Sequence, residues 1–444
     1  MAETIKNYGF GIDGVNLVTD PLKLKDSEAT QLQNAELLDD EQTGGRTALK
    51  QRGGFAALNG SALSGSVVGG TGWPLKTTYV RTLHASRQAE DSNTWKTSTN
   101  GTTWVDTATP AAAAIDSKFA DENNKRDARR MVAFRTYLLY PGNGYTQDTD
   151  PPIVVLWDGA ASVTVCAIAA PGSISNSSAA PIFAIVDMFV AEGNLYVLTH
   201  EPGGSSTHNC GQVLSLDLDS GVLRQVATAF SGTSPEIDGG APSCMAYYKG
   251  QLFVGLNGEA TTDGIGKIVR CFPGVDTTWT TDVSNLSGHV SSLGVFLGKL
   301  YAGTQSSATS AEKIYERSPT AGTWAAVFTG VGAGANAFCG CLSVHSDVLY
   351  AVQYHETAPT IHIKSSADGT TWATSRDCDA SDGAVAGNLP GQMATLSSAL
   401  HVVFRSTTTS ATDGFIMRLA SGTWTKVDTD NFGGQIAVLV QRSA

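Results

Sequence analysis

The residues of this chain that could perform chemistry are few and scattered. Cys339-Gly340-Cys341 holds the one close pair among seven cysteines, and no Cys or His follows at zinc-finger spacing. Tyr354-His355-Glu356 and His401 carry titratable groups, but the eight histidines show no paired metal-ligand spacing. No Walker loop, dinucleotide-binding fingerprint or HExxH motif is present. We therefore predict no catalytic residue, no metal site and no cofactor, with a redox or metal role for the cysteine pair as the alternative.

The one basic cluster has two interpretations. Lys125, Arg126, Arg129 and Arg130 lie within six residues of one another. Such a run is commonly a solvated loop, here between the first two structural repeats described below. The alternative is a contact with phosphate or with an acidic neighbouring subunit.

Composition narrows the fold class before any element is placed. The 444 residues include 48 glycines and only 16% charged residues, which suits many short strands joined by turns. The net charge of −12 makes the protein a poor candidate for wrapping duplex DNA, which needs clustered Lys and Arg. A conduit through which DNA slides would benefit from this weak repulsion. No window approaches the apolar length of a membrane span, and the first residues show no signal-peptide pattern. We expect an all-β protein made in the cytoplasm.

A short sequence phrase recurs along the chain, and the strands it predicts would form the scaffold that positions any functional side chains. In its fullest copy, Ser365 to Trp372, an alternating strand enters a turn at Gly369, and a second strand opens with Thr-Thr-Trp. This layout is typical of a β-hairpin whose tight turn needs a positive φ. The other copies are Ser98 to Trp104, Ala321 to Trp324, Ser421 to Trp424 and, more loosely, Pro273 to Trp279.

A second recurring feature gives the length of the repeat. A Leu-aromatic-Val/Ala pattern marks the expected second strand of each unit and returns at intervals of 48 to 58 residues, the length of a four-stranded propeller blade. Its clear copies begin at Leu195, Leu252, Leu300, Leu349 and Leu400, and poorer ones lie at Tyr79 and Tyr137. Third-strand segments are expected at Thr94–Gly101, Val154–Gly159, Val213–Gly221, Lys267–Gly274, Lys313–Gly322, His362–Gly369 and Phe415–Gly422. The sequence thus predicts a seven-bladed β-propeller over residues 74–444.

The ends of the chain predict how the ring closes. The first unit lacks a first strand, whereas Gln435 to Gln441 reads as a first strand with no unit after it. Placing this C-terminal strand in the first blade would close the ring and remove two open sheet edges.

Residues 1–73 form a separate segment in this interpretation. An extended arm is expected, then a short helix capped at Asp26, two strands at Ala35–Leu38 and Thr47–Arg52, and a Gly/Ser linker. An apolar segment without a core of its own must bind its own propeller or a neighbouring chain. The candidate partner-binding residues of this assembly arm are Val15, Leu17, Leu22, Leu24, Leu32 and Leu37.

The run Gly14 to Ala35, followed by Leu49 to Gly54, resembles the N-terminal arm of virion proteins from tailed bacteriophages. It has the Gly-hydrophobic-Asn-Leu start, the Asp-Pro-Leu step at Asp20 and the Asp-x-Glu-Ala helix start at Asp26. It departs from that pattern at Gln51 to Gly54, where an Arg-Pro-Gly type of exit is expected. In such proteins the arm precedes a β-rich body, often a propeller, and several form the tail hub or nozzle. The resemblance covers about 45 residues and implies a virion location.

The Ser-Ser-Ala-Asp-Gly-Thr-Thr-Trp phrase is also similar to the Asp-box turn of sialidases. There the turn is structural, so the similarity concerns fold and not chemistry. Sialidase chemistry needs three arginines, a Tyr-Glu nucleophile pair and an acid. Met131 to Thr136 contains a Phe-Arg without the Ile-Pro that follows it in sialidases, and no arginine triad can be assembled.

These observations together predict a structural, non-enzymatic virion protein of a tailed phage. The expected role is a ring-forming tail hub or nozzle subunit that lines or mounts the path of genome ejection. Its expected partners are copies of itself and neighbouring tail or adaptor proteins, with DNA passing transiently. The alternatives are a propeller that binds a host receptor or glycan on the tail or capsid surface, and a sialidase-like glycoside hydrolase.

Overall fold

The structure is a computed structural model in which part of the chain can be described. The described residues are 35–39, 47–51, 81–88, 95–107, 132–134, 137–142, 153–157, 163–167, 184–202, 209–217, 222–227, 242–256, 265–306, 311–330, 337–355, 360–382, 389–396, 398–405, 414–427 and 435–443. The chain divides into two compact units, Met1–Thr77 and Thr78–Ala444. The sequence places the corresponding boundary between residues 73 and 74.

The described part of the first unit is one hairpin. β1 (Ala35–Asp39) pairs antiparallel with β2 (Thr47–Gln51), and Leu37 lies opposite Leu49. The two strands predicted for this segment are therefore confirmed, each within one residue at its C-terminal end. The arm and the short helix expected before them lie outside the described residues, as do Val15, Leu17, Leu22, Leu24 and Leu32.

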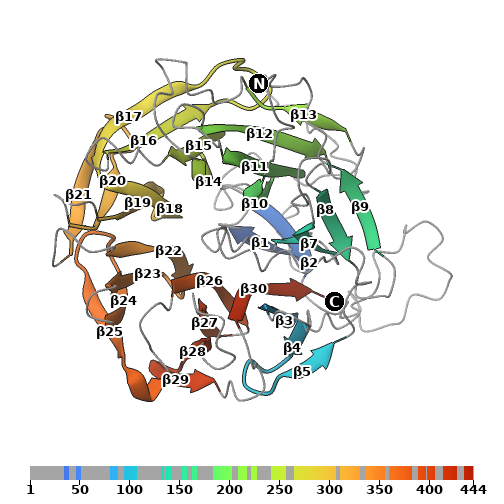
Figure 1. The fold of residues 1–444 in the computed structure, drawn as a ribbon, viewed down its shortest axis with the longest axis vertical. Coiled ribbons are helices and arrows are strands. Elements are labelled where there is room, and N and C mark those ends of the chain that lie inside the picture. The colour runs from blue at the N-terminus through green and yellow to red at the C-terminus, as the bar shows by residue number, and fades with distance from the viewer. Residues whose placement is uncertain are drawn as a thin grey trace, which may run out of the picture. The chain divides into compact units, whose positions relative to one another are not determined.

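The second unit is built of antiparallel sheets whose strands follow one another in sequence. Five sheets are separate and four-stranded, with the orders β30-β3-β4-β5, β6-β7-β8-β9, β10-β11-β12-β13, β14-β15-β16-β17 and β26-β27-β28-β29. In Figure 1 the sheets succeed one another around a circle, with β10, β14, β18, β22 and β26 innermost. This is the arrangement of a β-propeller, as predicted.

The bounds of the first strands are β3 (Arg81–Gln88), β4 (Trp95–Ser98), β5 (Val105–Thr107), β6 (Val132–Phe134), β7 (Tyr137–Gly142), β8 (Ile153–Trp157), β9 (Val163–Ala167), β10 (Ala184–Ala191), β11 (Asn194–Pro202), β12 (Asn209–Asp217), β13 (Leu223–Gln225), β14 (Pro242–Tyr248), β15 (Gln251–Leu256), β16 (Ile265–Cys271) and β17 (Thr280–Ser287). Those that follow are β18 (His289–Phe296), β19 (Lys299–Gln305), β20 (Lys313–Arg317), β21 (Trp324–Thr329), β22 (Phe338–His345), β23 (Val348–His355), β24 (Thr360–Ser366), β25 (Ala373–Cys378), β26 (Leu389–Leu396), β27 (Ala399–Arg405), β28 (Phe415–Ala420), β29 (Thr423–Val427) and β30 (Gln435–Ser443). One short 3₁₀ helix, η6 (Ala380–Asp382), follows β25.

The remaining strands, β18 to β25, form one eight-stranded sheet, which differs from the seven separate blades expected. β18-β19-β20-β21 and β22-β23-β24-β25 each run in sequence order, and one residue pair, Gln305 opposite Phe338, joins them. The physical reason is that the end of β19 comes within pairing distance of the start of β22, so the hydrogen-bond ladder continues across the boundary.

The C-terminal strand closes the ring as predicted. β30 pairs antiparallel with β3, from Arg81 opposite Ser443 to Gln88 opposite Gln435. The first sheet in sequence therefore takes its innermost strand from the end of the chain, and the blue and red strands lie side by side in Figure 1.

Neighbouring innermost strands are also joined by side chains at irregular points. β14 and β18 have register shifts at Ser243 and Ser291. Ser243 Oγ donates to Val290 O at 2.6 Å, and Ser291 Oγ donates to Cys339 O at 2.8 Å, each on the next innermost strand. Cys341 Sγ continues the series with Gly391 O at 2.7 Å. A β-bulge re-aims a side chain out of the ladder, which here lets one sheet bind the next.

Candidate functional site

The basic cluster is not among the residues that can be placed. Lys125, Arg126, Arg129 and Arg130 lie outside the described residues, so a solvated loop and a phosphate or subunit contact both stay open. Copies of the recurring phrase and of the second-strand pattern, and the Cys339–Cys341 pair, do lie among the described residues, at joints between sheets.

The recurring phrase forms the same turn in its two fullest copies. In the β24–β25 turn, Asp368 Oδ1 accepts hydrogen bonds from Thr370 N at 2.8 Å and Thr371 N at 2.6 Å. In the β4–β5 turn, Asn100 Oδ1 accepts from the backbone N–H groups of residues 102 and 103, at 2.9 and 2.8 Å. These bonds from Thr371 and Thr370 hold the pKa of Asp368 well below its usual range. Asp and Asn therefore play one structural role, which explains why the position changes between copies.

The two recurring sequence features meet across the joints. The aromatic residue of the second-strand pattern packs against the turn phrase of the next sheet along the chain. Tyr301 on β19 lies where a Cβ at Gly369 would overlap its hydroxyl group, and Tyr350 on β23 packs edge-on against Trp424 at 6.2 Å. Tyr196 on β11 shares a buried cluster with Trp279. The repeat thus encodes both halves of a joint.

The cysteine pair fits this structural picture. Cys339 is completely buried, and burial raises the pKa of its thiol far above the usual range. Cys341 binds the next innermost strand, as described above. Five cysteines are free thiols in the described residues, and no group of three or more metal-ligating side chains is found among them. In the same part of the chain, no helix has the length and apolar character of a membrane span.

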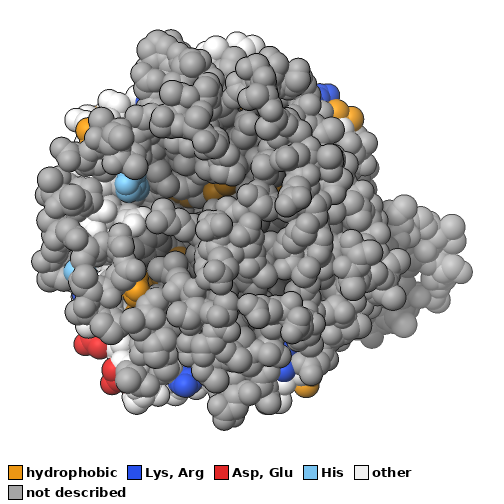
Figure 2. Space-filling view, viewed as in Figure 1, with side chains coloured by type: hydrophobic (Ala, Val, Ile, Leu, Met, Phe, Trp, Pro, Cys, Tyr) orange, Lys and Arg blue, Asp and Glu red, His pale blue; other side chains and the backbone are white. Residues whose placement is uncertain are grey.

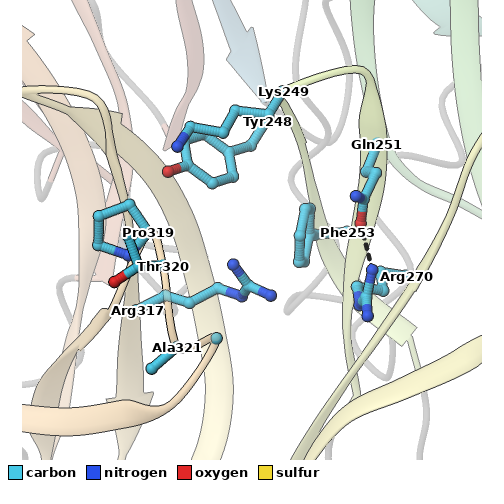
Figure 3. Close-up of a pocket in the computed structure, with 10 residues that line it drawn as sticks. Tyr248, Lys249, Gln251, Phe253, Arg270, Arg317, Pro319, Thr320 and Ala321 are labelled. Carbon is cyan, nitrogen blue, oxygen red and sulfur yellow. Dashed lines mark hydrogen bonds between the residues drawn. The ribbon is translucent and has the colours of Figure 1, made fainter.

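The joint between the β14–β17 sheet and the β18–β21 half-sheet holds a polar pocket. Its cavity of about 300 Å³ lies between the β14–β15 turn and the β20–β21 turn. The lining residues are Tyr248, Lys249, Gln251, Phe253, Arg270, Arg317, Pro319, Thr320, Ala321 and Gly322. Figure 3 shows the Arg317 guanidinium reaching from one wall toward Phe253 and Arg270 on the other.

A buried carboxylate organises the cationic groups behind this pocket. Asp282, on β17, has a side chain only 3% exposed. Arg317 donates to both of its oxygens, from Nε and Nη2, each at 2.8 Å. Trp324 Nε1 donates to Asp282 Oδ2 at 2.7 Å, and Arg270 Nε lies 2.9 Å from Oδ1. The hydrogen bonds that Arg317 donates to Asp282 raise the pKa of Arg317 above its ordinary value. Asp282 therefore holds both guanidinium groups in place.

Further contacts hold the two arginines toward the cavity. Arg317 also lies over the ring of Phe253, with its guanidinium carbon 5.3 Å from the ring centre. Arg270 Nη1 donates to Gln251 Oε1 at 2.7 Å, the dashed line in Figure 3. Lys249 is exposed at the rim, and its Nζ lies 5.2 Å from the ring centre of Tyr248. Arg270, Arg317 and Lys249 all line the pocket, and Asp282 is the carboxylate that the two arginines contact, so the lining carries an excess of positive charge.

Sequence reasoning missed this pocket. Arg270 and Arg317 stand near the ends of third strands in successive repeats, and Asp282 follows in the fourth strand of the first of them. That spacing was the available signal, but arginines near strand ends are common, and only the meeting of two sheets brings both to one carboxylate.

The innermost strands, where the ring converges, carry almost no charge. β14, β18, β22 and β26 contain no Asp, Glu, Lys or Arg. On β10, Asp187 is buried and accepts from the backbone N–H groups of Met188 and Met245, at 2.9 and 2.8 Å. In the view of Figure 2, most of the coloured Lys, Arg, Asp and Glu side chains lie near the outer edge of the molecule. No carboxylate pair for acid–base chemistry is therefore found on these five strands.

Comparison with known proteins finds fold similarity alone. No protein-family model matches the sequence, and no curated protein matches it. A crystal structure of a protein from Lactobacillus plantarum is similar with a TM-score of 0.53 and 14% identity, covering 82% of this chain and 99% of that one. This likeness agrees with the all-β propeller described above.

Two propeller-containing comparisons are more distant. A Trypanosoma rangeli sialidase matches with a TM-score of 0.40 and 13% identity over 64% of this chain and 51% of its own. A prolyl endopeptidase matches with a TM-score of 0.42 and 13% identity over 65% of this chain. The matched region spans 41% of that endopeptidase. At these identities and scores, neither activity transfers to this chain.

Proposed function

We propose that this protein is a non-enzymatic structural component of a tailed-phage virion, a ring-forming tail hub or nozzle subunit that lines or mounts the DNA ejection path. The location is the virion tail, and the partners are further copies of the chain and neighbouring tail or adaptor proteins. The phage assignment rests on the resemblance of residues 14–54 to virion arms. The structural role rests on the geometry of the second unit.

The observation that supports a non-catalytic role is that the repeated residues make contacts between neighbouring sheets. At several joints an aromatic position contacts the turn phrase of the next sheet, as Tyr301 does at Gly369 and Tyr350 does at Trp424. The innermost strands β10, β14, β18, β22 and β26 carry one carboxylate, Asp187, and so offer no carboxylate pair of the kind that glycoside hydrolysis requires. They also offer few cations to a passing DNA, which gains affinity mainly from released counterions.

The finer architecture is part of this proposal. We count the eight-stranded sheet as two blades, because a single residue pair joins its halves and each half repeats the four-strand order of the other sheets. This gives a seven-bladed propeller closed by β30. Each third-strand segment expected from the sequence overlaps the third strand of one such group, from β4 to β28.

The assembly role is tested with variants of the arm in particles. Deleting residues 1–73 should leave a folded second unit that no longer enters virions. Val15→Asp combined with Leu17→Asp should reproduce that defect, because charge on the apolar stripe opposes its burial, whereas Asn16→Asp serves as the matched control. Normal incorporation of the deleted chain, measured by mass spectrometry of purified particles, would refute the assembly role.

The absence of turnover is tested separately on the purified protein. At about 0.15 M salt, where the screening length is about 8 Å, we expect DNA affinity weaker than micromolar and no release of sugars from host glycans. Sub-micromolar binding of DNA would contradict the passage role. Sugar release would favour the sialidase-like alternative.

A further inference from the structure

We infer that the pocket between the β14–β17 sheet and the β18–β21 half-sheet binds a compact organic anion, with a carboxylate or phosphate monoester held by Arg317, Arg270 and Lys249. The site is independent of the assembly role proposed above. It lies at a joint between sheets, and its three cations, Arg317, Arg270 and Lys249, belong to neither of the two recurring sequence features.

The charge balance is the first step of the argument. Arg317, Arg270 and Lys249 face the same cavity, and the carboxylate bound by the two arginines is Asp282. One negative charge cannot neutralise three positive ones. A purely structural ion pair would need one arginine, as in the pair of Arg376 with Asp382 on β25 and η6. The excess charge at this joint raises the local concentration of anions.

The second step concerns the hydrogen-bond donors that remain. Arg317 donates from Nε and Nη2 to Asp282. Arg270 donates from Nη1 to Gln251, and its Nε lies 2.9 Å from Asp282 Oδ1 as an ion pair. Each guanidinium therefore keeps one terminal nitrogen that makes no hydrogen bond to a described residue. The ammonium of Lys249 likewise makes none to the described residues and lies over the Tyr248 ring. Charge-assisted hydrogen bonds to a carboxylate or phosphate are the strongest use of such donors.

The third step is the space itself. At two other joints the aromatic residue carries a polar tip that reaches the turn, Tyr301 at Gly369 and His401 at Gly101. At this joint the position is Phe253, which has no polar tip, and the Arg317 guanidinium lies over its ring. A Cβ at Gly322, where φ is +67°, would lie 3.1 Å from Arg317 Nη2, so glycine there leaves the guanidinium its room. The resulting volume of about 300 Å³ suits a ligand of monosaccharide size.

The test uses the full-length protein and calorimetric titration with two acids. Glucuronate tests binding of a carboxylate, and glucose 6-phosphate tests binding of a phosphate monoester. Neutral glucose is the control ligand. We expect at least one acid to bind in the millimolar range or tighter, with affinity falling as salt is raised and with no detectable binding of glucose. The stronger of the two acids identifies the anionic group.

Matched variants connect binding to this pocket. Lys249→Gln should weaken binding of the acid about two- to fivefold, the effect of one exposed charge. Lys426→Gln removes an equally exposed lysine from β29, on another sheet, and should leave affinity unchanged. Neither lysine is buried, so both variants should fold. Failure of both acids to bind, or an equal loss in the two variants, would overturn the inference.

Discussion

His401 Nε2 lies 3.2 Å from the carbonyl oxygen of Gly101, and this contact joins residues 300 positions apart. His401 is on β27 and Gly101 is in the β4–β5 turn, so the bond connects the last sheet of the ring to the first. The same kind of contact occurs at other joints, where the aromatic residue of a second strand packs against the turn of the next sheet. Together with the pairing of β30 and β3, it fixes the closure of the propeller.

The first prediction concerns the fit at this contact. Gly101 has φ of +74°, and a Cβ there would overlap His401 Nε2. Gly101→Ala should therefore cost about 1–2 kcal/mol for the left-handed backbone and about 1–3 kcal/mol more for overpacking. Gly250→Ala is the control, because its φ of +78° is similar and nothing lies within 4 Å. Urea unfolding should show the larger loss for Gly101→Ala, and equal losses would contradict the close fit.

The second prediction is a pH dependence that belongs to His401. Burial lowers the pKa of His401 from 6.5 to about 4, against the opposing effect of the Gly101 carbonyl. Since the unfolded chain binds the proton more readily, the stabilisation is complete above about pH 6.5 and is lost as the pH falls toward 4. The loss amounts to about 3 kcal/mol at 1.36 kcal/mol per pKa unit.

His401→Phe separates this contribution from other titrating groups. Phenylalanine occupies the equivalent position at Phe253, and it removes the ionisable ring. We expect the variant to be less stable than the wild type at pH 7 and to lose less stability between pH 7 and pH 4.5. The measurement is the free energy of unfolding at both pH values. Identical pH slopes in the two proteins would show that His401 does not titrate in this way.

The third prediction compares a buried carboxylate with an exposed one. Asp282→Ala leaves Arg317, Arg270 and Trp324 without their shared acceptor and should cost about 3–5 kcal/mol. Asp377 pairs with His362, and the Asp377 side chain is 72% exposed. Asp377→Ala should therefore cost only about 0–1 kcal/mol. Thermal and urea unfolding of both variants provide the comparison. Similar small losses would mean that Asp282 does not organise the joint.

The fourth prediction tests the closing strand. Deleting residues 435–444 removes β30 from β3 and exposes the edge of the first sheet to other chains. We expect aggregation in light scattering, or a marked fall in melting temperature, because apolar burial of about 25 cal/mol per Å² is lost as well. Deleting Ala444 alone, beyond the end of β30, should have no effect. A soluble, equally stable chain without β30 would place the closure elsewhere.

The sequence by itself determined the local features of the second unit. The hairpin turns, the alternating strands and the surplus strand at the C-terminus follow from turn chemistry and from period-two patterns, both of which act over a few residues. The phrase around Asp368 and its copy around Asn100 were recognisable because the backbone N–H groups they bind lie two and three residues away. The hairpin of β1 and β2 was recognisable for the same reason.

The tertiary structure alone decided which side chains meet between neighbouring sheets of the second unit. Three contacts between successive four-strand groups are examples. Tyr301 fits against Gly369, and Arg270 and Arg317 share Asp282. β19 pairs with β22 through Gln305 and Phe338. Repeat spacing shows that such contacts exist, but not which side chains face one another, because each depends on the twist and tilt of two neighbouring sheets. The pocket at Arg317 lies where two neighbouring sheets meet, and no periodic pattern in the chain predicts it.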